Sequence, residues 1–92
     1  MGYPCQRDHT QALDDVQEEL ARARKKFPRR QASAHEGFAV LAEEVDELWD
    51  EVKSSKLAPV KRTARMRAEC VQIAAMAIRF IEDVCDHGSR ER

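Results

Sequence analysis

The segment from Cys70 to Val84, CVQIAAMAIRFIEDV, is apolar on nearly every side of the helix that its spacing predicts. Only Gln72 and Arg79 interrupt it before Glu82. A helix that is apolar all round is normally buried all round. A chain of 92 residues has too little else to surround such a helix. We therefore expect it to pack against another subunit as well, in a homodimer or homotetramer.

Helix start and stop signals predict three helices in all, at about residues 8–27, 33–53 and 59–87. The first has Asp8 as its N-cap and ends before Pro28, because a proline disfavours helical geometry in the preceding residue. The second opens on the capping box SAHE, residues 33–36. Pro59 fits the first turn of the third helix, and Gly88 fits its C-cap. The predicted fold class is all-α, a three-helix chain assembling into a helical bundle.

The second helix has an apolar stripe that should face the core or an interface. Trp49 lies beside this stripe, and we expect it to be covered in the same way. The stripe consists of Phe38, Leu41, Val45, Leu48 and Val52.

Length and composition narrow the class of protein. Residues 1–92 are expected to form one domain, with loose tails at 1–7 and 88–92. A net charge of −1 gives no basic excess for binding nucleic acid, and no apolar run approaches the ~20 residues of a membrane span. The 3 cysteines have no CxxC spacing, and no signal peptide precedes them. We expect a cytoplasmic protein that binds neither membranes nor nucleic acid.

The stretch AEEVDELWDEV, residues 42–52, holds six carboxylates with no Lys or Arg among them. Glu44 and Glu47 are three residues apart, and Glu43 and Glu47 are four apart, so their side chains can converge on one point. The helix dipole also disfavours carboxylates in the middle and C-terminal half of a helix. A solvated polar face is the ordinary explanation of an acidic run, and it stays open at this point.

The third helix carries a matching pair of side chains. Glu69 and Gln72, again three residues apart, lie on the same side as Ile73 and Met76. A carboxylate at the edge of a buried apolar face is costly unless it is paired or bound to a cation. Two such oxygen pairs predict a Mg²⁺ site, with Mn²⁺ as an alternative ion, because Mg²⁺ prefers hard oxygen ligands. A di-iron centre is disfavoured, since it would have histidine at Gln72.

Glu43-Glu44-x-x-Glu47, followed after 21 residues by Glu69-x-x-Gln72, resembles the EExxE…ExxD signature of the MazG-like all-α nucleoside triphosphate pyrophosphohydrolases. The flanking sequences HEGFAVLAEEVDELWDEV and RAECVQIAAMAIRFIEDV are similar to those of the small single-domain members. The resemblance implies a helical bundle assembled as a dimer or tetramer. It also implies Mg²⁺-dependent cleavage of a (d)NTP into the nucleoside monophosphate and pyrophosphate, an activity in nucleotide-pool control.

Carried onto this chain, the resemblance makes Glu44, Glu47 and Glu69 the main metal ligands, with Gln72 at the fourth position. Glu43 would hold a further ion or orient the attacking water. Mg²⁺ bridges phosphates and lowers the pKa of a bound water, and a neighbouring carboxylate can take the proton of that water. Glu43 and Glu47 are therefore the candidate catalytic residues.

One position departs from the signature, which has aspartate where this chain has Gln72. A glutamine carbonyl can ligate Mg²⁺ but brings no charge to it. A nucleotide- or metal-binding relative with impaired catalysis is therefore one alternative. A structural helical module with solvated carboxylates is another.

Four basic residues are weaker candidates for binding the triphosphate. Arg79 lies two turns after Gln72 on nearly the same face, and arginine can bind phosphate oxygens with two hydrogen bonds. A salt bridge from Arg79 to Glu82 or Asp83 is an equally ordinary role. The other three, Lys53, Lys56 and Arg65, follow or precede the acidic positions on the two helices.

Overall fold

The computed structural model describes residues 9–54 and 58–87, in which every regular element is a helix. Helix α1 spans His9–Lys26, α2 spans Ala34–Lys53 and α3 spans Pro59–Phe80. A π-helical segment, η2, continues α3 over Ile81–Asp86. The all-α prediction of three helices is confirmed for the described residues. The tails expected at 1–7 and 88–92, like the caps expected at Asp8 and Gly88, lie outside them.

The ends of the helices follow from local sequence chemistry. Ser33 is the N-cap of α2, and its hydroxyl accepts a hydrogen bond from the backbone N–H of Glu36 at 3.1 Å. The Glu36 carboxylate reaches back to the backbone N–H of Ala32, one residue before the position that a standard capping box uses. Pro59 occupies the first turn of α3, where its missing N–H is not needed.

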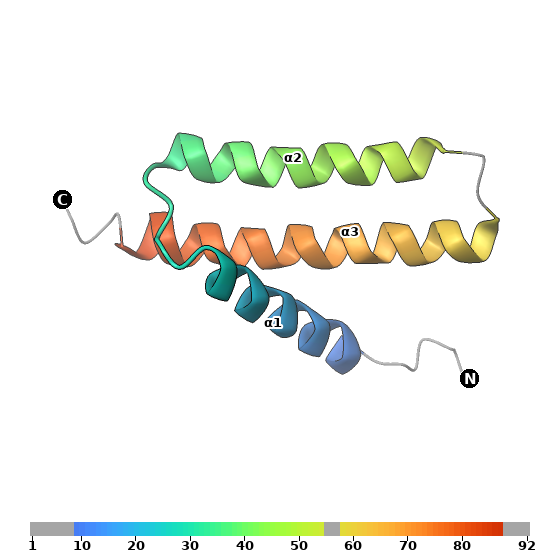
Figure 1. The fold of residues 1–92 in the computed structure, drawn as a ribbon, viewed down its shortest axis with the longest axis horizontal. Helices are drawn as coiled ribbons and strands as arrows, with labels where there is room; N and C mark the ends of the chain where they lie inside the picture. The colour runs from blue at the N-terminus through green and yellow to red at the C-terminus, as the bar shows by residue number, and fades with distance from the viewer. Residues whose placement is uncertain (1–8, 55–57, 88–92) are drawn as a thin grey trace.

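Helix α3 is the central element, since it packs against both other helices. Figure 1 shows α2 and α3 running antiparallel side by side, while α1 crosses α3 obliquely. The buried hydrophobic residues come from α1 and α3: Val16, Ala23, Ala75 and Met76. Partly buried residues of all three helices pack around them: Leu20, Val40, Leu41, Val71, Ala74 and Ile78. No helix in the described ranges is long and apolar enough to cross a membrane.

The apolar stripe expected along α2 is divided between two surfaces. Leu41 and Leu48 are half-buried. Phe38, Val45 and Trp49 are instead 65%, 46% and 56% exposed, so they do not lie in the core of the single chain, and their place in an interface stays a prediction. These three residues form what we call the outer apolar face of α2. Among the described residues α2 packs mainly against α3, which covers one side of it.

Candidate metal centre

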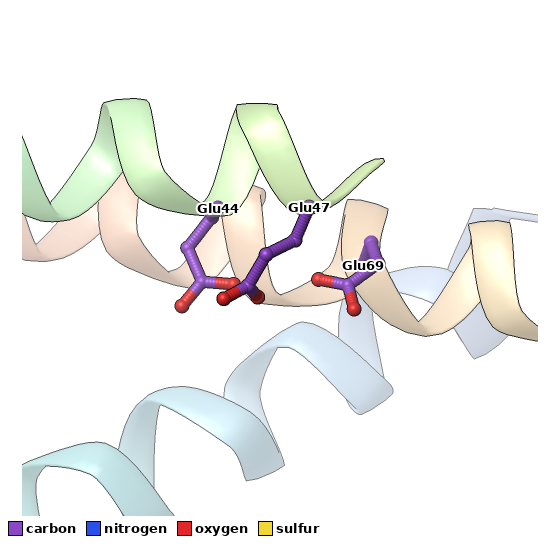
Figure 2. A group of neighbouring side chains, drawn as sticks. All are labelled: Glu44, Glu47 and Glu69. Carbon is purple, nitrogen blue, oxygen red and sulfur yellow. The ribbon is translucent and has the colours of Figure 1, made fainter. Parts of the chain in front are cut away.

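Glu44, Glu47 and Glu69 converge on one point between two helices. The first two project from α2 and the third projects from α3, and the carboxylates point toward one another in Figure 2. One oxygen from each carboxylate lies within 4.8 Å of the others. The three-residue spacing on α2 brings the first pair together, and the antiparallel packing of α2 and α3 brings Glu69 to them. The convergence expected from the sequence is therefore present for these three residues.

The electrostatics of this cluster are unfavourable for three ionised carboxylates. Burial, together with the negative charges of Glu47 and Glu69, raises the pKa of Glu44 to about 7. Burial and the charge of Glu47 also raise the pKa of Glu69. None of the three forms an ion pair with a Lys or Arg among residues 9–54 and 58–87. The cluster therefore favours either a bound proton or a bound cation.

Glu69 supplies a second sign that the cluster lacks a partner. Its Oε1 is buried and has no hydrogen-bond partner within the described part of the chain. A buried carboxylate oxygen without a partner is costly. A hard cation would satisfy it, and the donor set consists only of oxygens, which Mg²⁺ and Mn²⁺ accept.

Gln72 of α3 lies beside Glu44 of α2. The amide orientation that suits its neighbours directs Nε2 to the Glu44 carboxylate, at 2.9 Å and 3.3 Å from the two oxygens. Gln72 is thus a hydrogen-bond donor to one of the cluster carboxylates.

A cavity of about 1040 Å³ adjoins the cluster. Glu43, which is exposed, lines it together with Glu44 and Gln72. Glu43 is outside the group of three converging carboxylates, but its negative charge contributes to raising the pKa of Glu44. The cavity is of the size of small-molecule sites in proteins. Its walls come from the C-terminal half of α1, residues 27–31, α2 and α3.

Arg79 also lines this cavity, but its guanidinium is held in a buried network. Its Nε donates to Oδ2 of Asp83 at 3.3 Å. Its Nη2 donates to the backbone carbonyls of Phe27 and Arg29 at 3.1 Å and 3.0 Å. The salt bridge to Asp83 that the sequence allowed is therefore present. Arg79 ties residues 27–29 to α3.

Asp83 is the other centre of this network. Besides Arg79, its carboxylate accepts hydrogen bonds from Arg24 of α1 at 3.3 Å and from the backbone N–H of Gln31 at 3.2 Å. Burial alone would raise the pKa of Asp83, but these hydrogen bonds and the arginine charges lower it on balance. The network thus joins α1, the α1–α2 connection, the end of α3 and η2.

The remaining basic candidates pair with acids outside the group of three converging carboxylates or lie outside the described residues, although the charge of Glu69 does act on Arg65. Lys53 pairs with Asp50 at 3.6 Å and lies over the ring of Trp49. Arg65 pairs with Glu51 at 3.0 Å. Lys56 lies outside the described residues.

Gln31 is a polar residue of the site that sequence reasoning missed. It is only 8% exposed, it lines the cavity, and neither polar atom of its side chain has a hydrogen-bond partner in the described ranges. Leaving a buried donor or acceptor unpaired costs about 1–3 kcal/mol. Gln31 stands in a helix-breaking stretch, KFPRRQA, where no periodicity indicates which side chains turn inward.

Comparison of the chain with family models, with curated proteins and with solved structures finds no match in any of the three.

Proposed function

We propose that this protein is a Mg²⁺-dependent (d)NTP pyrophosphohydrolase, which converts a nucleoside triphosphate and water to the monophosphate and pyrophosphate. The observation that carries the proposal is the convergence of Glu44, Glu47 and Glu69 within 4.8 Å beside a cavity of about 1040 Å³. The sequence resemblance to MazG-like enzymes adds the reaction type.

The metal would be held by Glu44, Glu47 and Glu69. The unpartnered buried oxygen of Glu69 and the all-oxygen donor set fit Mg²⁺, or Mn²⁺ in its place. When bound, such an ion offsets phosphate charge and lowers the pKa of a coordinated water.

The residues of the chain would then do the remaining work of hydrolysis. The oxygen of the attacking water forms a bond to the α phosphorus, and the bond from that phosphorus to the α–β bridging oxygen breaks. Glu43, exposed at the cavity wall next to Glu44, would orient the water and accept its proton. Pyrophosphate leaves with the bridging oxygen. Glu47 is the second candidate for the proton acceptor, since it is the exposed member of the cluster.

Assembly and location belong to the same proposal. A homodimer or homotetramer would cover the outer apolar face of α2, which a single chain leaves exposed. A role in nucleotide-pool control would place the protein in the cytoplasm.

One observation favours a second candidate, a nucleotide- or metal-binding relative with impaired catalysis. Gln72 donates to Glu44 instead of adding a carboxylate. This hydrogen bond reduces the charge available to a cation at the point where the signature has aspartate.

The experiment that tests the proposal is a panel of the ribo- and deoxyribonucleoside triphosphates, assayed with Mg²⁺, with Mn²⁺ and with a chelator. We expect stoichiometric monophosphate and pyrophosphate, and no product with the chelator. Release of orthophosphate would contradict the proposed bond cleavage. Metal binding without any turnover would favour the second candidate.

A further inference from the structure

The cavity beside the carboxylates has an unsatisfied amide at its other end. The Gln31 side chain is 8% exposed, and neither its Oε1 nor its Nε2 has a partner among the residues that the structure describes. Buried polar groups in folded proteins are nearly always hydrogen-bonded. An amide that offers one donor and one acceptor side by side therefore indicates a ligand with the complementary pair.

The length of the cavity can be followed along α2 and α3. Gly37 and Glu44 lie two turns apart on one face of α2, which is about 10 Å along the helix axis. Gln31 packs against Gly37, since a Cβ built on that glycine would lie 2.8 Å from Oε1 of Gln31. The same built atom would lie 2.6 Å from the ring of Phe80. The amide is thus at the Phe80 end of α3, and the carboxylates are at the Gln72 end.

Along α2 and α3 the middle of the cavity wall is apolar, while α1 adds the charged residues Glu19, Arg22 and Lys26 to the lining. Val40 of α2 and Met76 of α3 line it between the two ends. A carboxylate end, an apolar middle and an amide end match the order of groups in a nucleotide: charged phosphates, then the sugar, then a planar base. The distance along α2 also matches the length of a nucleoside.

We propose that the Gln31 amide recognises the nucleobase of the substrate, by pairing with adjacent donor and acceptor atoms on its edge. This inference rests on the proposed function, because the phosphates would lie at Glu44, Glu47 and Glu69. The side chain needs to rotate toward the cavity to make both hydrogen bonds. The apolar contacts of Val40 and Met76 would lie against the sugar and the base.

The backbone around Gln31 is already fixed for such a role. Its N–H donates to Asp83 at 3.2 Å, and Arg79 donates to the carbonyl of Arg29 at 3.0 Å. Holding a binding residue in place before the ligand arrives reduces the entropy lost on binding. Arg79 and Asp83 therefore position the backbone from which the Gln31 side chain projects.

The test replaces the amide by a thioether of similar length, Gln31→Met. We expect kcat/KM for the preferred (d)NTP to fall by ~10-fold or more, the equivalent of about one hydrogen bond, with kcat nearly unchanged. The preference among bases should flatten. Gln17→Met, at an exposed glutamine of α1 that does not line the cavity, should leave all constants unchanged. An unchanged base preference in folded Gln31→Met protein overturns the inference.

Stability separates recognition from a structural role. Replacing an unpaired buried amide by an apolar group of similar shape is neutral or stabilising. The melting temperature of Gln31→Met should therefore equal or exceed that of the wild type, while base preference is lost. If that variant does not fold, Gln31→Glu keeps the acceptor and replaces the donor by a second, charged acceptor. It should change the order of preference among bases, and the wild-type order in this variant counts against the inference.

Binding of nucleosides alone distinguishes this inference from the proposed function. Nucleosides have no phosphate and need no metal, so their binding can be followed by calorimetry or NMR with a chelator present. Binding that weakens ~10-fold in Gln31→Met supports base recognition even in a protein that hydrolyses nothing. Equal binding by both proteins, or no binding by the wild type at millimolar nucleoside, overturns it. A nucleotide bound in the opposite direction, with its phosphates at Arg29 and Arg30, also overturns the inference. The preference among bases would then not depend on Gln31.

Discussion

The amide nitrogen of Gln72 lies 2.9 Å from a carboxylate oxygen of Glu44. This hydrogen bond joins α3 to the acid of α2 whose pKa is raised to about 7. Gln72→Asp would replace this donor by a fourth carboxylate. We expect the metal-free variant to melt at a lower temperature, because repulsion increases, and its Mg²⁺ concentration for half-maximal rate to fall several-fold. Titration of the rate with Mg²⁺ measures this. An unchanged Mg²⁺ dependence in stably folded protein would show that position 72 is not a ligand.

Neutralising one carboxylate of the cluster should remove both the stabilisation of the protein by Mg²⁺ and the hydrolysis. Glu47→Gln removes repulsion with Glu44 and Glu69, so the metal-free melting temperature should rise. Mg²⁺ at 100 times its Kd stabilises the wild type by about 2.7 kcal/mol, or on the order of 10 °C, and the variant should lose this gain. Hydrolysis should fall at least ~100-fold.

The matched control for this substitution is Asp46→Asn, an exposed acid on the same helix but outside the converging group. It should keep both the metal-induced rise and the activity. Fluorescence-monitored melting with Mg²⁺ and with a chelator makes the comparison. Full activity in Glu47→Gln would contradict the prediction and would show that the acidic stretch is a solvated polar face.

Glu44 should give the metal-free protein a distinctive pH dependence. Its pKa rises from 4.5 to about 7 on folding, so the folded state binds the proton more tightly than the unfolded state. This proton binding contributes to the free energy of unfolding. The contribution is fully present below pH 4.5 and is lost as pH rises through about 7. The melting temperature in chelator should therefore fall across this window, and Glu44→Gln should flatten the decline.

Mg²⁺ should oppose this decline, because the metal binds the ionised carboxylates and its affinity increases with pH. Glu18→Gln, at an exposed glutamate of α1, serves as the control and should follow the wild type. A wild-type melting temperature that stays flat across this window, with no difference from Glu44→Gln, would contradict the prediction.

Arg79 should contribute far more to stability than a surface arginine does. Arg79→Met leaves Asp83 buried with fewer partners, and breaking a buried ion pair costs about 3–5 kcal/mol. Arg22→Met breaks an exposed pair with Glu19 and should cost less than about 1 kcal/mol. Unfolding in urea measures both. A loss below about 1 kcal/mol for Arg79→Met would show that the network is not stabilising.

The sequence predicts the helices well and the connections poorly. Capping by Ser33 and the prolines at positions 28 and 59 are local signals, and spacing on one helix brings Glu44 to Glu47. Asp83 was visible as a partner of Arg79 through its four-residue spacing. The burial of Gln31 was not, because it depends on how residues 27–31 lie against α3, and no periodicity encodes that packing. The helical spacing of the apolar residues in α2 also could not predict which of them face α3 and which lie on the outer apolar face.

The outer apolar face of α2 leads to the last prediction, on assembly. Phe38, Val45 and Trp49 recur at seven and four residues, so they share one face, and each is at least 46% exposed. An aromatic side chain buries about 150–250 Å² in an interface, which favours a partner over solvent. We expect the purified protein to be a dimer or tetramer by light scattering at micromolar concentration. Trp49→Lys should shift it toward the monomer.

The control for this shift is Leu13→Lys, since Leu13 is 57% exposed but lies on α1. It introduces the same charge at a similarly exposed apolar position, and it should leave the assembly unchanged. Because an obligate interface resembles a domain core cut in half, Trp49→Lys should also lower the melting temperature, and the loss should grow on dilution. A well-folded wild-type monomer at micromolar concentration would show that α2 keeps this face exposed to solvent.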